Sequence, residues 1–145
     1  MTNKIENAND ELAQKEVAVD HQFLQMGLAW LASARQESAI ASMVDDLTDY
    51  LKTHFDAEER PGGFFDAVVA DAPRHAGPVA ELREEHSRLL EQLATIRGAI
   101  HAPYGEATEA VLAETAAFVR AMRHHERREA SLLQDAFTRD FGTGD

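Results

Sequence analysis

Apolar residues recur along most of the chain at alternating steps of three and four positions. This spacing is typical of amphipathic helices whose apolar face packs against other helices. Glycine and proline interrupt it at few places, mainly Pro61-Gly62-Gly63, Pro73 to Pro78 and Pro103-Tyr104-Gly105. A turn is also expected near residues 34–37, because one helix over residues 10–60 would far exceed the usual length. The pattern therefore predicts four helices, over residues 10–34, 37–60, 77–101 and 106–139.

Four helices joined mostly by short turns are typical of an up-down-up-down four-helix bundle, which is an all-α fold. The longest connection is expected to hold a short helical turn around residues 64–70. No alternation of apolar and polar residues typical of strands is found. At 145 residues the chain is long enough for one domain with a single core. Residues 1–9 and 141–145 are expected to form flexible tails.

The four apolar stripes share one feature, a histidine in place of an apolar residue. The stripes are Val17, His21, Leu24, Leu28 and Leu31; Ile40, Val44, Leu47, Leu51, His54 and Glu58; Val79, Leu82, His86, Leu89, Leu93, Ile96 and Ile100; and Val111, Thr115, Phe118, Met122, His125, Glu129, Leu132 and Ala136. Two of the histidines, His54 and His125, are followed four positions later by a glutamate. Residues four apart lie on one helix face, so each pair presents two potential ligands together.

Glu58 and Glu129 are carboxylates on helix faces that are expected to be buried. Burying a carboxylate is costly unless a counter-charge is supplied. No Lys or Arg occupies any of the four stripes. The sequence therefore predicts that a metal cation inside the bundle neutralises these two glutamates.

The six polar stripe residues are expected to lie at one level of the bundle. Counted from the turn near residue 35, His21 and His54 lie about 21 and 28 Å along their helices. Counted from the turn near residue 104, His86 and His125 lie about 27 and 32 Å along theirs. Helical side chains lean toward the N-terminus, which brings the two glutamates back to the same layer. One metal site is thus predicted, formed by His21, His54, Glu58, His86, His125 and Glu129.

A single histidine on an apolar helix face is more often an ordinary core residue than a ligand, and an isolated His-x-x-x-Glu is usually a surface pair. The joint pattern favours a metal site, because four helices carry ligand-type residues at one level. His101 and His124 lie off the stripes and are expected to be solvated. The predicted metal site lies nearer the end of the bundle that carries the 61–76 connection, here called the metal end. His75 lies in that connection, and a role as an extra ligand or gate is the less favoured alternative.

The aromatic residues are expected to serve mainly in packing. Phe23, Trp30, Phe55 and Phe118 lie on or beside the stripes, and we expect them to line the core. Phe64 and Phe65 are expected to cap the metal end, and shielding of the site from water is a weaker alternative to plain packing. Tyr50 has no informative spacing, and the sequence assigns it no role.

The ligand types narrow the choice of metal. Imidazoles and carboxylates without sulfur suit iron, manganese or zinc and disfavour Cu(I), and the chain has no cysteine. Four histidines and two glutamates are too many donors for one tetrahedral zinc ion but suit two ions bridged by the glutamates. Iron is favoured, with manganese or zinc as alternatives. The Glu-x-x-His pairs of ferritin-like proteins and the His-Glu-x-x-His motif of zinc proteases are both absent.

Charge limits the classes of partner. The chain has 26 acidic residues against 14 Lys and Arg, which gives a net charge of −12. This balance disfavours binding to nucleic acid or to an anionic membrane surface, since both attract positive charge. Neither a secretory signal nor a membrane-spanning stretch is found. We therefore expect a cytoplasmic protein.

Four segments of the chain together resemble the hemerythrin-like, or HHE cation-binding, family. They are Asp20-His21-Gln22-Phe23-Leu24, His54-Phe55-Asp56-Ala57-Glu58-Glu59, Glu85-His86-Ser87-Arg88-Leu89-Leu90 and His125-Glu126-Arg127-Arg128-Glu129, and the match spans about residues 17–137. The resemblance implies a four-helix bundle around a non-haem di-iron centre, bridged by two carboxylates and an oxo or hydroxo group. It also implies that the six predicted residues are the iron ligands.

Two positions depart from the oxygen-carrying hemerythrins. Leu82 stands where those proteins have a second histidine on the third helix, and Ala130 stands where they have an aspartate. The missing ligand at Leu82 is expected to leave a more open metal. The four-His, two-Glu set is more similar to bacterial di-iron proteins linked to nitric oxide and oxidative stress, including iron-centre repair proteins. Those carry an additional cysteine-containing domain, which this chain lacks.

The favoured function is a single-domain di-iron protein that binds or reduces O2, NO or a peroxide, in oxidative or nitrosative stress or in oxygen sensing. One alternative is a metal-responsive sensor or iron-handling module without turnover, whose redox or regulatory protein partner the sequence does not identify. The other is a metal-free acidic bundle with a structural role.

Overall fold

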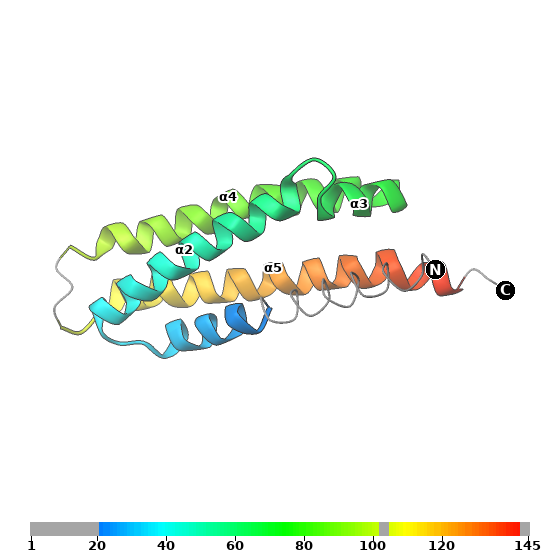
Figure 1. The fold of residues 1–145 in the computed structure, drawn as a ribbon. Coiled ribbons are helices and arrows are strands. Elements are labelled where there is room, and N and C mark those ends of the chain that lie inside the picture. The colour runs from blue at the N-terminus through cyan, green and yellow to red at the C-terminus, as the bar shows by residue number, and fades with distance from the viewer. Residues whose placement is uncertain (1–20, 102–104, 143–145) are drawn as a thin grey trace, which may run out of the picture.

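Antiparallel helices make up the molecule, which was obtained as a computed structural model that describes residues 21–101 and 105–142 (Figure 1). The first described helix covers residues 21–33, and a turn leads into α2 (Glu37–Glu59). The connection to the next long helix contains α3 (Phe64–Asp71) and a 3₁₀ turn, η1 (Pro73–His75). The long helices α4 (Ala76–Ala99) and α5 (Glu109–Gly142) complete the bundle.

The predicted all-α bundle is confirmed, and the predicted helices lie within a few residues of the observed ones. Within the described residues the only β-type pairing is an isolated bridge between Gln36 and Glu106, which joins the two turns at one end of the bundle. The start of the first predicted helix, residues 10–20, and the expected tail 1–9 lie outside the described residues. At the other end α5 continues to Gly142, two residues into the expected tail. No described helix has a stretch that is long and apolar enough to cross a membrane.

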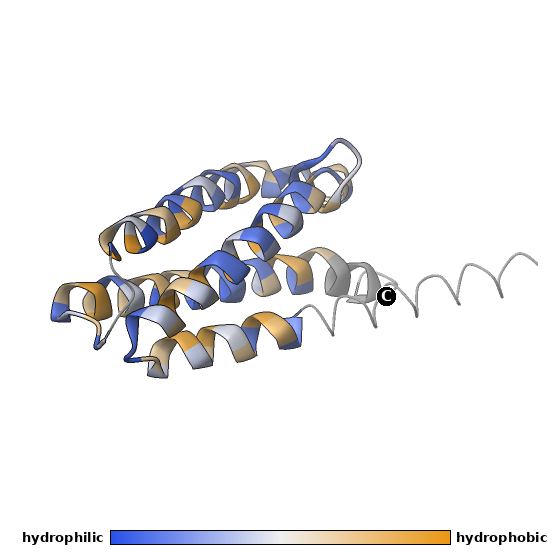
Figure 2. Cartoon of the chain, turned by 60° about the vertical axis from the view of Figure 1, so that its left-hand side comes forward, coloured by the Kyte–Doolittle hydropathy of each residue, from blue (hydrophilic) through white to orange (hydrophobic). Residues whose placement is uncertain are grey.

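The core consists of two apolar clusters separated by a polar layer. The larger cluster lies toward the Gln36–Glu106 bridge and contains stripe residues from all four long helices, for example Leu28, Leu47, Leu93 and Phe118. The smaller cluster lies under α3. Hydrophobic and hydrophilic residues alternate around each helix, as amphipathic packing requires (Figure 2). The predicted histidine and glutamate positions occupy the layer between the two clusters.

Two aromatic residues expected in the core are instead half-exposed. Phe23 and Trp30 each retain 48% of their accessible surface, whereas Phe55 and Phe118 are buried as predicted. Each of the two exposed residues precedes a buried leucine of the first helix by one position. One position rotates a side chain by about 100° around the helix axis, which carries both rings to the edge of the apolar face. Phe55, one position after His54, turns toward α4 instead and stacks on His86.

Helix α3 covers the end of the bundle that is farthest from the bridge. Its buried residues Phe65 and Val68 pack against Leu82 of α4 and Leu132 of α5 in the smaller cluster. Phe65 is fully buried, and its ring lies 5.3 Å from that of His86. The expectation that this segment caps the metal end is therefore consistent with its packing.

Gly63, the residue before α3, is held so tightly that a side chain cannot fit. A Cβ atom there would lie 2.6 Å from the carbonyl oxygen of Ala57 and 2.8 Å from that of Arg60. We expect Gly63→Ala to displace α3 and to lower the free energy of unfolding by about 1–3 kcal/mol, as measured by chemical denaturation. Gly77→Ala is the control, because a Cβ atom at Gly77 meets nothing within 4 Å. Equal stabilities of Gly63→Ala and the wild type would contradict this account of the turn.

Candidate metal centre

Five of the six predicted ligands converge in the polar layer. Nε2 of His54 lies 3.2 Å from Oε1 of Glu58, and Nε2 of His125 lies 3.2 Å from Oε2 of Glu129. The two pairs therefore present their ligand atoms together, as the i, i+4 spacing on α2 and α5 predicts. From α4, Nε2 of His86 reaches to 3.6 Å from the same oxygen of Glu58.

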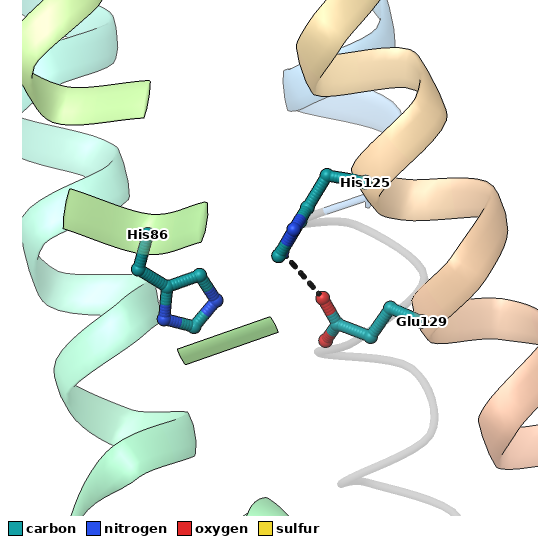
Figure 3. Close-up of side chains that lie close together, drawn as sticks. All are labelled: His86, His125 and Glu129. Atoms are coloured by element: carbon teal, nitrogen blue, oxygen red, sulfur yellow. Dashed lines mark ion pairs between the residues drawn. The ribbon is translucent and has the colours of Figure 1, made fainter. Parts of the chain in front are cut away.

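The ligand atoms form two overlapping groups of three. One group contains His86, His125 and Glu129, and the other contains His54, Glu58 and Glu129. Within each group the ligand atoms lie within 4.8 Å of one another. His86 points from α4 toward His125 and Glu129 on α5, and the three side chains face a common space (Figure 3). Glu129 belongs to both groups, which is the arrangement that two neighbouring metal ions sharing a carboxylate require.

Several of these ligand atoms lack hydrogen bonds although they are shielded from water. Both carboxylate oxygens of Glu58 and Nε2 of His86 and of His125 are buried without a hydrogen-bond partner among the described residues. Leaving such groups unsatisfied costs about 1–3 kcal/mol each, and more if they are charged. A cation coordinated by these atoms would remove that cost. The donor set therefore fits a metal ion.

The buried positions of these side chains shift their pKa values away from the charged forms. Burial, together with smaller effects of the neighbouring His125 and His54, lowers the pKa of His86 to about 3. Burial also lowers the pKa of His125, against the opposing effect of its hydrogen bond to Glu85. Burial raises the pKa of the Glu129 carboxyl to about 7. Neutral imidazoles are the form that binds metals, so the two histidines are already in their ligand state at neutral pH.

Two aromatic rings stack on the His86 imidazole. The Phe55 ring stacks on it at 3.7 Å between centroids with an interplanar angle of 7°, and the Phe65 ring stacks at 5.3 Å with an angle of 21°. His86 is almost completely buried. Close packing of this kind disfavours other orientations of the ring.

His21, the sixth predicted ligand, lies at the edge of the site. Its side chain is 58% exposed, and Nδ1 lies 3.6 Å from Oε1 of Glu126. It belongs to neither ligand group, but it lines the same cavity as His54, Glu58 and Glu129. Its assignment as a ligand therefore stays a prediction.

A cavity of about 330 Å³ opens from the ligand groups toward the first helix. Its walls are mostly apolar and include Leu24, Phe64, Met122 and Leu133. Ala130, which stands in place of the aspartate of the oxygen carriers, lines this cavity. Leu82, which stands in place of their extra histidine, is buried in the smaller apolar cluster. The open side of the site therefore lies toward Ala130 rather than toward Leu82, because the packing of α3 covers the latter.

The other histidines occupy the places that the sequence suggested for them. His101 and His124 are exposed. His75 is buried, and its Nε2 lies 3.5 Å from Oδ2 of Asp135 on α5. It is absent from both ligand groups, and this contact instead joins the segment after α3 to α5.

Sequence reasoning missed several residues around the site. Tyr50 lines the cavity and stacks on His54 at 5.7 Å, and its position four residues before His54 on the same helix face was the available signal. Glu59, Glu85 and Glu126 each approach a ring nitrogen of a predicted ligand. Their signal was adjacency, since each is next in sequence to a predicted ligand.

The fold and the site together define a class, that of helical bundles with a metal centre of histidine and glutamate between the helices. The chain matches the family described as the Hemerythrin HHE cation binding domain over residues 12–137. This match covers most of the chain, which therefore belongs to that family. No curated protein and no solved structure matches the chain.

Proposed function

We propose that this protein holds two iron ions between its helices and there binds or reduces a small ligand, namely O2, NO or a peroxide, in oxidative or nitrosative stress or in oxygen sensing. The observation that carries the proposal is the pair of ligand groups that share Glu129. A single structural ion would need only one such group. Two adjacent groups joined by a carboxylate favour a dinuclear centre.

The residues divide into those that would hold each ion. His86 and His125 would hold one ion and His54 the other, and Glu129, which belongs to both groups, would lie between them. Glu58 is predicted as the second bridge, and its Oε1 lies within 3.6 Å of Nε2 of His86 as well as beside His54. Nitrogen and carboxylate ligands without sulfur suit iron, as they also suit manganese or zinc. Two iron ions would supply redox-active Lewis acids to which a small ligand can bind.

The cavity supports a small ligand of low polarity. Its lining includes the exposed His21 and reaches His54, Glu58 and Glu129, and most of the lining surface is apolar. Apolar walls offer few hydrogen bonds to a large polar substrate, whereas O2 and NO need no polar partner beyond the metal. For a peroxide, Tyr50 and Glu126 are polar residues of the same lining.

The two alternative functions, a metal-responsive module without turnover and a metal-free structural bundle, predict different roles for the same residues. A sensor or iron-handling module would use the same ligands but would respond to metal or oxidant without turnover. A metal-free structural bundle would leave both carboxylate oxygens of Glu58 and the Nε2 atoms of His86 and His125 buried without hydrogen-bond partners, which is energetically unfavourable. The buried ligand atoms therefore favour either metal-dependent function over the structural one.

Iron analysis combined with optical spectroscopy tests the proposal. We expect aerobically purified protein, or protein reconstituted with Fe(II) without oxygen and then exposed to air, to contain two iron ions per chain. It should show ligand-to-iron charge-transfer bands in the near ultraviolet, and these should change when NO or peroxide is added. Catalytic consumption of peroxide would indicate an enzyme, and stoichiometric binding would indicate a sensor. Absence of bound iron and of these bands after reconstitution would contradict the proposal.

A further inference from the structure

Three glutamates outside the predicted ligand set each contact a predicted ligand histidine. Oε2 of Glu85 lies 2.8 Å from Nδ1 of His125, and this contact is a hydrogen bond. Oε2 of Glu59 lies 3.3 Å from Nδ1 of His86, within ion-pair distance but without the geometry of a hydrogen bond. The third contact, at 3.6 Å, joins Glu126 and Nδ1 of His21. In each of the three histidines, the carboxylate therefore approaches Nδ1 rather than Nε2.

We propose that Glu59, Glu85 and Glu126 are positioning residues, each of which fixes the imidazole of the metal ligand on a neighbouring helix. This inference rests on the proposed function, in which His86 and His125 bind metal, and at the third contact on the prediction that His21 is a ligand as well. To the proposed ligands, the inference adds three residues that do not bind metal themselves. These residues determine which ring nitrogen of each histidine faces the centre.

The three contacts follow a regular order through the bundle. Each glutamate is next in sequence to a predicted ligand on its own helix and contacts the ligand of a different helix. Glu59 reaches from α2 to α4, Glu85 from α4 to α5, and Glu126 from α5 to the helix over residues 21–33. Consecutive side chains point about 100° apart on a helix, so one faces the centre and the next faces the adjacent helix. Helices α2, α4 and α5 therefore each supply both a predicted ligand and the group that orients the predicted ligand of the next helix.

A carboxylate at Nδ1 has a definite chemical consequence. An ionised carboxylate can only accept hydrogen bonds, so Nδ1 of His125, which is hydrogen-bonded to Glu85, must carry the proton. At His86 and His21 the facing carboxylate favours the same tautomer by charge attraction, since a proton on Nδ1 lies toward the negative oxygen. The lone pair then lies on Nε2, the atom that His86 and His125 direct toward Glu58 and Glu129. Such a partner also makes the imidazole a stronger donor to a metal. The proposed role is thus selection of the tautomer that binds metal.

Further contacts hold the three carboxylates in place. Arg128 pairs with Glu85 and also with Glu81, at 2.7 Å, so its guanidinium bridges two turns of α4. Arg83 lies 4.0 Å from Oε1 of Glu59. Glu126 instead accepts a hydrogen bond from the side-chain amide of Gln25. Its side chain is only 10% exposed. The support is strongest at Glu85 and weakest at Glu59, whose pair with Arg83 is long and partly exposed.

The sharpest test compares two neighbouring glutamates on α4. Glu85→Gln keeps the shape of the side chain but removes the charge that holds the proton on Nδ1 of His125. Glu84→Gln makes the same change of charge one position away, at an exposed residue. The tautomer of His125 is read by ¹⁵N NMR of the metal-free protein, and iron affinity is read by competition with a chelator. Circular dichroism confirms that each variant is folded.

We expect Glu85→Gln to shift His125 from the Nδ1-protonated form to a mixture and to weaken iron binding about 10–100-fold, with Glu84→Gln unchanged in both. Glu59→Gln should shift His86 but not His125, a selectivity that general destabilisation would not produce. The inference is overturned if Glu85→Gln leaves either the tautomer or the affinity unchanged, or if Glu84→Gln alters them equally. Should Glu85→Gln not fold, Glu59→Gln decides by the same criteria at His86. Wild-type protein that binds no iron would instead overturn the proposed function, before any variant is made, and this inference with it.

Discussion

Glu129→Gln is expected to abolish binding of both metal ions, whereas His54→Ala should remove only one of them. The reason is that Glu129 belongs to both ligand groups and His54 to one. Glutamine has the size of glutamate but supplies no negative charge, and a bridging position between two cations depends on that charge most. The measurement is metal content per chain after reconstitution with Fe(II) and removal of excess metal.

The matched control for this comparison is Glu114→Gln. Glu114 lies on the same helix as Glu129 but is exposed, so its replacement changes the net charge equally without touching the centre. It should retain the wild-type metal content. If Glu129→Gln kept one ion bound, the two groups would be independent sites, and the proposal that both ions share the Glu129 carboxylate would be incorrect. If it kept both, Glu129 would not be a ligand.

The sequence was sufficient to predict the bundle and the level of its polar layer. The positions of the helices follow from the local spacing of apolar residues, and the positions of the turns follow from glycine and proline. Neither depends on many long-range contacts. The level of the site follows from the rise per residue. For the same reason His54, Glu58, His86, His125 and Glu129 could be assigned to one layer from the sequence alone, and the structure brings these five together.

Features that depend on how helices rotate against one another could not be predicted in this way. The half-exposure of Phe23 and Trp30 depends on a rotation of about 100° at the edge of a stripe. The side on which the site opens depends on which residues α3 covers, namely Leu82 rather than Ala130. The contact between Glu85 and His125 joins two helices through side chains that no periodicity relates. Such contacts require the packed structure.

The second large effect concerns the stability of the metal-free protein. His86→Leu is expected to abolish metal binding and yet to stabilise the chelator-treated protein. Both ring nitrogens of His86 are buried without a hydrogen-bond partner. A leucine of similar volume against Phe55 and Phe65 removes this cost, which is about 1–3 kcal/mol. Chemical denaturation near pH 7.5 measures the gain, and a loss of stability there would contradict the account.

The advantage of His86→Leu should grow as the pH falls. The pKa of His86 is about 3 in the folded protein, below the ordinary value of 6.5. Between these values the unfolded chain binds the proton more readily, so the contribution of His86 to the stability of the wild type falls on acidification by about 1.4 kcal/mol per pH unit. Glu129, whose pKa is raised to about 7, has the opposite effect between its ordinary value and that pH. It is present in both proteins, so its contribution cancels in the comparison.

The expected difference can be stated for two conditions. Relative to about pH 7.5, the stability gap between His86→Leu and the wild type should widen by about 1.4 kcal/mol near pH 5.5 and by about 3 kcal/mol near pH 4. His124→Gln is the control, since His124 is an exposed histidine on α5 and its removal should leave the pH dependence unchanged. A gap that stays constant with pH would mean that His86 titrates normally in the folded protein. In that case the imidazole would be accessible to water, and its burial against the two phenylalanine rings would not describe the protein in solution.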